Sequence, residues 1–238
     1  MFTRLSVRYY DALYEAKGKD YAREAQRLHG YIRQYKCCPN GALLDVACGT
    51  GGRLAFLRRF YEVEALDLNP DMLEEARRKC PDAVFHRGNM MDFQLNRFFG
   101  VVVCLFCSLP YVKTVPRLHR AVQTMTNHIE HGGLVIIEPW FNQKTFHAGS
   151  VHGVYVDQPD LKIARINRGA IEDGIAVVNF HYLVGTPDGV EHFSERHELG
   201  LFSHDDYMTA FQSAGLEVAY DAEGLTGLGL YIGRRGNH

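Results

Sequence analysis

Short apolar runs alternate with stretches of helical periodicity up to about residue 140. The apolar runs have the length of strands and lie at 42–47, 63–68, 83–85, 101–106 and 134–138. Between them, apolar residues recur at three- and four-residue spacing, which predicts helices at 8–35, 54–60, 72–80 and 115–130. Strands that alternate with helices are typical of an α/β fold with a Rossmann-like, doubly wound, mostly parallel sheet.

The alternation of strands and helices ends after Pro139, where strand-like runs follow one another without helices. Turn residues separate these runs, which indicates an antiparallel meander. The runs lie at 163–168, 176–184 and 191–201. A helix at 204–214 and strands at 216–221 and 228–233 follow, and they complete a seven-stranded sheet.

The pattern therefore predicts a small antiparallel β layer inserted after strand five of the main sheet. We expect N-terminal helices at 1–36 to form a lid over a cofactor-binding core at 37–150. The insertion covers 151–200, and 201–238 holds the C-terminal helix and the last two strands of the core sheet.

Composition adds few constraints, because 46% of residues are hydrophobic, 23% are charged and the net charge is −2. No basic excess exists, so charge gives no reason to expect a nucleic-acid partner. No run has the length of a signal-peptide core or a membrane span, so we expect a cytoplasmic protein with no membrane partner.

The cysteines and histidines do not predict a metal site. Cys104 and Cys107 lie in an apolar run that reads as a buried strand, with no second pair nearby, so we interpret them as reduced, buried thiols. The twelve histidines form no ligand cluster in the sequence, and His128 and His131 lack the spacing of a zinc helix motif. We expect no metal.

Candidate chemistry is concentrated where the predicted parallel strands end. The first strand runs through Asp45 into a turn that contains Gly49 and Gly51, and such a turn lets backbone approach a ligand. A dinucleotide fingerprint would have glycine or alanine at position 54, which is Leu54 here. The second strand ends at Asp67, where a carboxylate can bind both hydroxyls of a ribose.

The third strand is followed by Gly88-Asn-Met-Met-Asp92, in which an amide and an apolar side chain suit the edge and face of adenine. Because the ends of parallel strands meet at one edge of a sheet, these three signals together predict a nucleoside-binding site. A ribose carboxylate is common to nicotinamide and S-adenosylmethionine sites, so spacing alone leaves both open.

Four segments resemble class I S-adenosylmethionine methyltransferases. They are Leu43-Leu-Asp-Val-Ala-Cys-Gly-Thr-Gly51, Asp71-Met-Leu, Gly88-Asn-Met-Met-Asp-Phe93 and Gly132-Gly-Leu-Val-Ile-Ile-Glu-Pro-Trp140. Further segments resemble the N,N-dimethyltransferases of nucleotide-linked amino sugars, which complete desosamine- and mycaminose-type sugars of macrolide antibiotics. These are Tyr10-Asp-Ala-Leu-Tyr14, Gly18-Lys-Asp-Tyr21, Phe202 and Gly227-Leu-Gly-Leu-Tyr231. The resemblance covers nearly the whole chain.

The resemblance implies S-adenosyl-L-methionine as cofactor and a role for each matching residue. Tyr14 and Tyr111 would be catalytic and orient the acceptor amine. Residues implied to bind the cofactor are Tyr10, Tyr21, Asp45, Ala47, Gly49, Gly51, Asp67, Leu68, Met72, Asn89, Met90 and Leu105. Residues expected to bind the acceptor, by the strand-end rule or by their place in the antiparallel layer, are Glu138, Trp140, His181, Arg196 and His197. The family also implies a homodimer.

Three positions depart from the family pattern. Relatives tend to have Glu at Asp67, Asp at Asn89 and Arg at Leu228, and an arginine at the last position would suit a phosphate of the acceptor. Two alternatives stay open: a methyltransferase with another small amine or hydroxyl acceptor, and a non-catalytic module that binds S-adenosylmethionine. A nicotinamide oxidoreductase is the least favoured because of Leu54.

Overall fold

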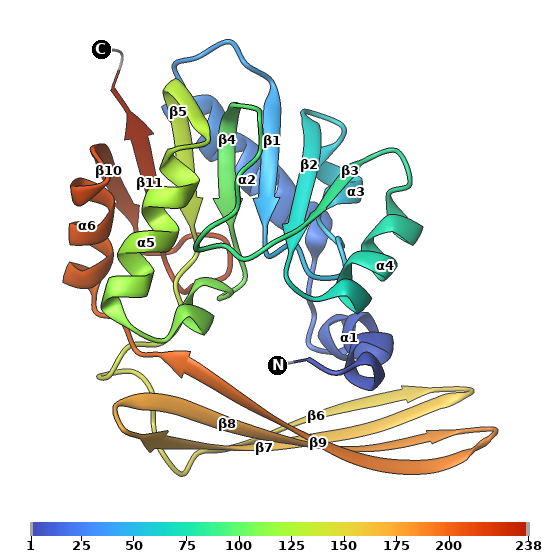
Figure 1. Ribbon diagram of the computed structural model, residues 1–238. Coiled ribbons are helices and arrows are strands. Elements are labelled where there is room, and N and C mark those ends of the chain that lie inside the picture. The colour runs from blue at the N-terminus through green and yellow to red at the C-terminus, as the bar shows by residue number, and fades with distance from the viewer. Residues whose placement is uncertain (1, 237–238) are drawn as a thin grey trace.

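The computed structural model describes residues 2–236 as two sheets with helices around the larger one (Figure 1). The larger sheet has seven strands in the order β10-β11-β5-β4-β1-β2-β3. Strands β1 to β5 are parallel, whereas β11 runs antiparallel to both β5 and β10. Its strands are β1 Ala42–Val46, β2 Glu62–Asp67, β3 Val84–Arg87, β4 Phe99–Cys104, β5 Ile129–Ile137, β10 Leu216–Asp221 and β11 Leu230–Arg235. The sheet confirms the α/β prediction.

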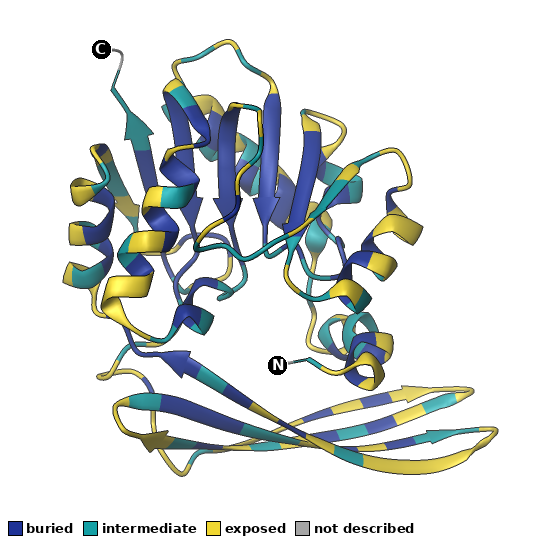
Figure 2. Cartoon of the chain, in the orientation of Figure 1, coloured by how far each residue is buried: buried dark blue, intermediate teal, exposed yellow. Residues whose placement is uncertain are grey.

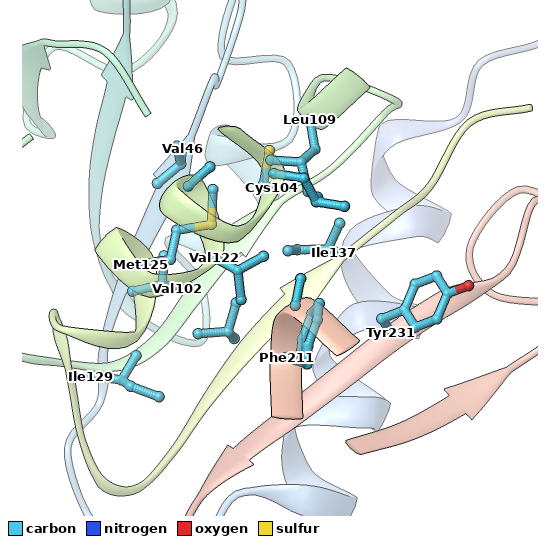
Figure 3. Close-up of a cluster of buried hydrophobic side chains, with 14 of the residues drawn as sticks. Val46, Val102, Cys104, Leu109, Val122, Met125, Ile129, Ile137, Phe211 and Tyr231 are labelled. Carbon is cyan, nitrogen blue, oxygen red and sulfur yellow. The ribbon is translucent and has the colours of Figure 1, made fainter. Parts of the chain in front are cut away.

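Helices cover both faces of this sheet and bury a large apolar cluster on each. One cluster packs α5 and α6 against β1, β4, β5 and β11, with Val102, Val122 and Phe211 at its centre (Figure 3). The other cluster packs α2, α3 and α4 against the opposite face. The helices are α1 Arg4–Ala16, α2 Tyr21–Tyr35, α3 Leu54–Leu57, α4 Pro70–Lys79, α5 Val115–Thr126 and α6 His204–Ser213, with a 3₁₀ turn η1 at Leu109–Val112.

Several boundaries differ from the sequence prediction, and those of β5 and α3 differ for reasons that the backbone shows. Strand β5 begins at Ile129, five residues before the predicted start, because Gly132 and Gly133 form an irregularity inside the strand and not a turn before it. The register with β4 shifts between Phe99 and Val101, and Gly132 has φ +75°, which glycine adopts without strain. Helix α3 ends at Leu57, so it forms only one turn of the predicted helix.

The smaller sheet is an antiparallel meander in the order β6-β7-β8-β9. It lies across the carboxyl ends of the parallel strands (Figure 1). Its strands are β6 Val151–Gln158, β7 Leu161–Glu172, β8 Ile175–Thr186 and β9 Gly189–Gly200. Buried and exposed positions alternate along them (Figure 2), as expected when one face packs on protein and the other meets solvent. The antiparallel layer after strand five is thus confirmed, although its first strand, β6, was not among the three runs that the sequence indicated.

Helix α1 lies between this layer and the larger sheet (Figure 1). Thr3 caps its first turn by accepting a hydrogen bond from the backbone N–H of Ser6, and Ser6 reciprocates at the Thr3 backbone. Tyr9 and Leu13 project from α1 into an apolar cluster with Ile163 and Tyr182 of the layer. In residues 2–236, no helix is long and apolar enough to cross a membrane.

Candidate active site

A pocket with about 960 Å³ of empty space, its open mouth included, lies at the carboxyl ends of the parallel strands. This position is the one where ligands bind in open α/β sheets. Residues from α1, α2 and the ends of β1, β2, β3 and β4 line it. Ten of the residues singled out in the sequence are among them: Tyr10, Tyr21, Ala47, Gly49, Asp67, Leu68, Met72, Asn89, Met90 and Tyr111.

The glycine turn after β1 is held against the end of β2 by a carboxylate. The backbone N–H of Gly49 donates to Oδ2 of Asp67 at 2.9 Å, and that of Asn69 donates to Oδ1 at 2.8 Å. A carboxylate has about four acceptor sites, so Asp67 keeps capacity for two further donors such as the hydroxyls of a ribose. Gly49 and Gly51 have φ +57° and +70°, which explains why glycine occupies both positions.

Asp45 is a buried carboxylate without a partner. Both of its oxygens are buried and neither has a hydrogen bond within the described residues. Burial raises the pKa of Asp45 to about 6, against the opposing charge of Arg53. The side chain does not line the pocket itself but lies two residues before Ala47, which does. A buried acidic group of this kind favours a cationic ligand nearby.

Arg53 is a pocket residue that the sequence did not single out. Its Nη1 donates to Glu24 at 3.1 Å, and Lys19 lies 2.7 Å from the same carboxyl group. The Nε of Arg53 has no partner within the described residues. The guanidinium of Arg53 lies at one end of the pocket, and the unpaired carboxyl group of Asp45 interacts with its charge from outside the lining. Together they make a suitable environment for an amino-acid moiety.

The other end of the pocket is apolar with a few polar atoms. Met72 of α4 and Met90 line it beside Asn89. Asn89 Oδ1 accepts a hydrogen bond from the backbone N–H of Met91 at 3.1 Å. Two thioether side chains can pack on the faces of a purine, and the amide can bind its edge. The described geometry therefore fits an adenosine with an attached amino-acid group.

Aromatic rings close the pocket on the side of α1. The rings of Tyr10 and Tyr14 are 4.5 Å apart, and Tyr14 meets Phe106 edge-on at 4.9 Å. Burial raises the pKa of Tyr14, so its hydroxyl stays protonated. Tyr21 packs on Gly52, where a Cβ atom would lie 2.6 Å from the ring.

Tyr111 links the pocket to the smaller sheet. Its hydroxyl lies 2.6 Å from Nδ1 of His197, a buried residue of β9.

Glu138 is also buried, and its Oε2 accepts from the backbone N–H of Phe106 at 2.6 Å. Trp140 packs on Phe146 with ring centroids 5.4 Å apart. Glu138 and Trp140 thus support the pocket wall and do not line the pocket.

The structure does not bring His181 and Arg196 to the pocket. Both side chains are exposed, whereas their sequence neighbours Tyr182 and His197 are buried, so both lie on the outer face of the smaller sheet. Arg196 donates to Glu172 there, at 2.6 Å from Nη2 to Oε2. Side chains of successive strand residues point to opposite faces, so His197 points inward where its neighbour points outward. The substrate-binding expectation for these two exposed residues has no support in this geometry.

Gly51 and Leu105 lie behind the pocket. Leu105 is fully buried in the apolar cluster on the α2 side. At Gly51 a Cβ atom would lie 2.9 Å from Cβ of Ala76, so this glycine lets the turn approach α4. Tyr14 likewise does not line the pocket, although its ring contacts the lining residues Tyr10 and Phe106.

Several lining residues were missed in the sequence. Thr50, Gly52 and Asn69 lie in the turns that follow predicted strand ends, so the strand-end rule could have found them. Phe2 lies far from every motif in the sequence, and only tertiary packing brings it to the pocket. The others are Cys48, Leu66, Gly88, Phe106 and Ser108.

Comparison with known proteins agrees with this geometry. The family model described as a methyltransferase domain matches residues 43–133. Among characterised relatives is the dTDP-3-amino-3,4,6-trideoxy-alpha-D-glucopyranose N,N-dimethyltransferase of Streptomyces venezuelae. It is 40% identical over 226 residues, which are 94% of this chain and 95% of the relative.

Two solved structures are similar over almost the whole chain. The crystal structure of Streptomyces venezuelae DesVI has a TM-score of 0.91 and 38% identity, covering 99% of this chain and 100% of that one. CalS10, an amino pentose methyltransferase from Micromonospora echinaspora involved in calicheamicin biosynthesis, has a TM-score of 0.87 and 34% identity, covering 99% and 98%. Its structure contains bound S-adenosylmethionine.

Proposed function

The chain belongs to the family of N,N-dimethyltransferases that act on dTDP-linked amino sugars, and we propose that it methylates the amino group of such a sugar. The protein is an S-adenosylmethionine-dependent methyltransferase, as its methyltransferase domain and its relatives show. The observation that carries the proposal is the pocket itself. The carboxylate of Asp67, two thioethers and three tyrosines line one cavity at the carboxyl ends of the strands.

The described residues suit the cofactor part by part. Asp67 has free acceptor capacity for the ribose hydroxyls, and Met72 and Met90 offer apolar surface for the adenine. The unpartnered carboxylate of Asp45 favours the positively charged end of the cofactor, while Arg53 suits its carboxylate. The bound cofactor supplies an activated methyl group on a sulfonium.

The acceptor would enter beside the tyrosines at the mouth of the pocket. Methyl transfer to an amine is an in-line displacement, so the protein must mainly align the nitrogen and exclude water. Tyr111 lines the pocket, and Tyr14 lies against two lining rings. Their hydroxyls are the groups that we propose orient the amine.

Calorimetry followed by a direct assay tests this function. We expect S-adenosylhomocysteine to bind with a micromolar Kd and thymidine diphosphate to release further heat from the loaded protein. We then expect mass spectrometry to show addition of two methyl groups to a dTDP-linked amino sugar. Binding of S-adenosylhomocysteine with no methylation of dTDP-linked 3-amino or 4-amino sugars would contradict the proposed acceptor. A protein that does not bind S-adenosylhomocysteine would contradict the cofactor site.

Assembly, location and domain division remain predictions. We propose a homodimer, and exposed apolar side chains on the outer face of the smaller sheet support it: Tyr155, Ile166 and Leu183. Sedimentation analysis at micromolar concentration tests this directly. A cytoplasmic location and the division at residues 36, 150 and 200 are likewise proposed.

A further inference from the structure

A hydrogen-bonded chain runs from the pocket wall into the inner face of the smaller sheet. The hydroxyl of Tyr111 lies 2.6 Å from Nδ1 of His197, and Nε2 of His197 lies 3.2 Å from Oε2 of Glu195. Glu195 and His197 are two residues apart on β9, so both point toward the core. Both are buried, with 5% and 1% of their surface exposed.

Glu195 sets the direction of these hydrogen bonds. It accepts from the backbone N–H of Thr3 and from the hydroxyls of Ser6 and Tyr182. Although burial opposes ionisation, hydrogen bonds from His197 and Ser6 lower the pKa of Glu195 to about 2. Glu195 is therefore a carboxylate that only accepts hydrogen bonds, so the proton on His197 must be on Nε2.

The second ring nitrogen of His197 must then accept. Burial, with a contribution from the charge of Arg165, lowers the pKa of His197 and keeps the ring neutral. A neutral ring with its proton on Nε2 has a lone pair on Nδ1, so Tyr111 donates its O–H there. The rings of Phe2 and Phe180 lie edge-on to His197 at 4.6 and 5.1 Å and cover it.

The hydrogen bond to His197 fixes the role of the Tyr111 hydroxyl oxygen. Because its O–H is committed to His197, the hydroxyl oxygen of this pocket-lining residue can meet a ligand only as an acceptor. An amine N–H is a donor, and its hydrogen bond to Tyr111 leaves the nitrogen lone pair free to point elsewhere. Resting on the proposed function, we propose that Glu195 and His197 are positioning residues that hold Tyr111 as the acceptor for the substrate amine and take up its proton.

The proton transfer balances within this chain. The N–H bond of a protonated amine breaks as an O–H bond forms on Tyr111, and the former Tyr111 proton moves to Nδ1 of His197. The electron pair stays on the amine nitrogen, and the imidazolium is paired with Glu195. Two methylations need this step twice, because the first leaves a charged secondary ammonium that cannot attack until it loses a proton. Between the two steps the imidazolium of His197 returns its proton to solvent, which its lowered pKa favours.

Two variants separate proton uptake from packing. His197→Asn keeps an acceptor near the position of Nδ1 but cannot take up a proton, whereas His197→Leu keeps only bulk. For His197→Asn we expect kcat at least about tenfold lower, little change in KM or in the Kd of S-adenosylhomocysteine, and accumulation of monomethylated product. For His197→Leu we expect a larger loss of kcat. His192→Asn, on the exposed outer face of the same strand, is the matched control.

Unchanged kcat and product ratio in both variants would overturn the proposal. A wild-type protein that methylates no amino sugar would instead contradict the proposed function. Nitrogen NMR of the imidazole rings then decides independently of activity, with the His197 signal assigned by its loss in His197→Asn. We expect a neutral ring with its proton on Nε2 at pH 7.5, and a proton on Nδ1 would refute the hydrogen-bond direction.

Discussion

Asp45 illustrates at the scale of one residue how a binding site can cost stability. Its buried carboxyl has no hydrogen-bond partner among residues 2–236, and burial raises its pKa to about 6 from an ordinary value of 3.8. Because the folded pKa is the higher one, the destabilisation is absent below pH 4 and complete above pH 6. We expect Asp45→Asn to gain stability relative to wild type by about 2–3 kcal/mol between pH 4 and pH 7. Urea unfolding at both pH values measures this change.

Effects of the new amide group on the free energy of unfolding that do not depend on pH cancel when the two pH values are compared. Asp188→Asn, at an exposed position, controls for the loss of one negative charge. A stability difference that does not change with pH would contradict the unpaired state of Asp45. If Asp45 also attracts the cationic end of the cofactor, Asp45→Asn must bind S-adenosylhomocysteine more weakly while unfolding at higher urea. A variant that is more stable and binds as tightly would separate this carboxyl from the site.

Among the individual residues of the site, some positions could be predicted from the sequence and others could not. Asp67, Met72 and Asn89 line the pocket because each lies at or shortly after the carboxyl end of a parallel strand, and such strand ends share one edge. Whether the side chains of His181, Arg196 and His197 point inward or outward depends instead on the alternation along the strand, in which successive residues face opposite sides of the sheet. The sequence did contain this information for β9. The apolar residues Phe193 and Leu199 are an even number of positions from His197, so they share its face, whereas Arg196 is on the other face.

At the scale of elements, the turn between β1 and α3 depends on its contact with α4. Gly51 has φ +70°, and a Cβ there would lie 2.9 Å from Cβ of Ala76. Gly18, between α1 and α2, has φ +79° but no atom within 4 Å of such a Cβ. We expect Gly18→Ala to cost about 1 kcal/mol from backbone strain alone. Gly51→Ala should cost about 1–3 kcal/mol more from the clash, as measured by urea unfolding.

Ala76→Gly tests the assigned cause in a double-mutant cycle. Removal of the opposing Cβ should recover part of the Gly51→Ala loss, with a coupling above about 0.5 kcal/mol. Additive effects would show that the turn does not press on α4. The sequence predicted a glycine-rich turn here, but it could not predict the close approach of Gly51 to Ala76, because α4 is a separate element.

At the scale of the whole molecule, the sequence predicted two sheets but not what joins them. The inner face of the smaller sheet is covered by α1 and by the pocket wall, through Leu13 on one side and the bond between Tyr111 and His197 on the other. Neither contact follows from a motif, since each joins segments far apart in the chain. The pocket therefore lies between parts that must assemble together, and we expect them to unfold together.

Leu13→Ala tests whether the two sheets unfold together. Leu13 is 1% exposed and packs with Val154, Ile163 and Val184, so its truncation should cost about 2–5 kcal/mol. Trp140, the single tryptophan, packs on Phe146 beside the smaller sheet, and its fluorescence reports on that region, whereas circular dichroism reports on all helices. If the molecule unfolds as one unit, both signals move to lower urea together. The matched control is Leu5→Ala, the same change at a 41% exposed position of α1, and it should move neither signal by more than about 0.5 kcal/mol. A fluorescence transition that moves alone would mean that the antiparallel layer unfolds independently, and the pocket could then open without loss of the cofactor-binding sheet.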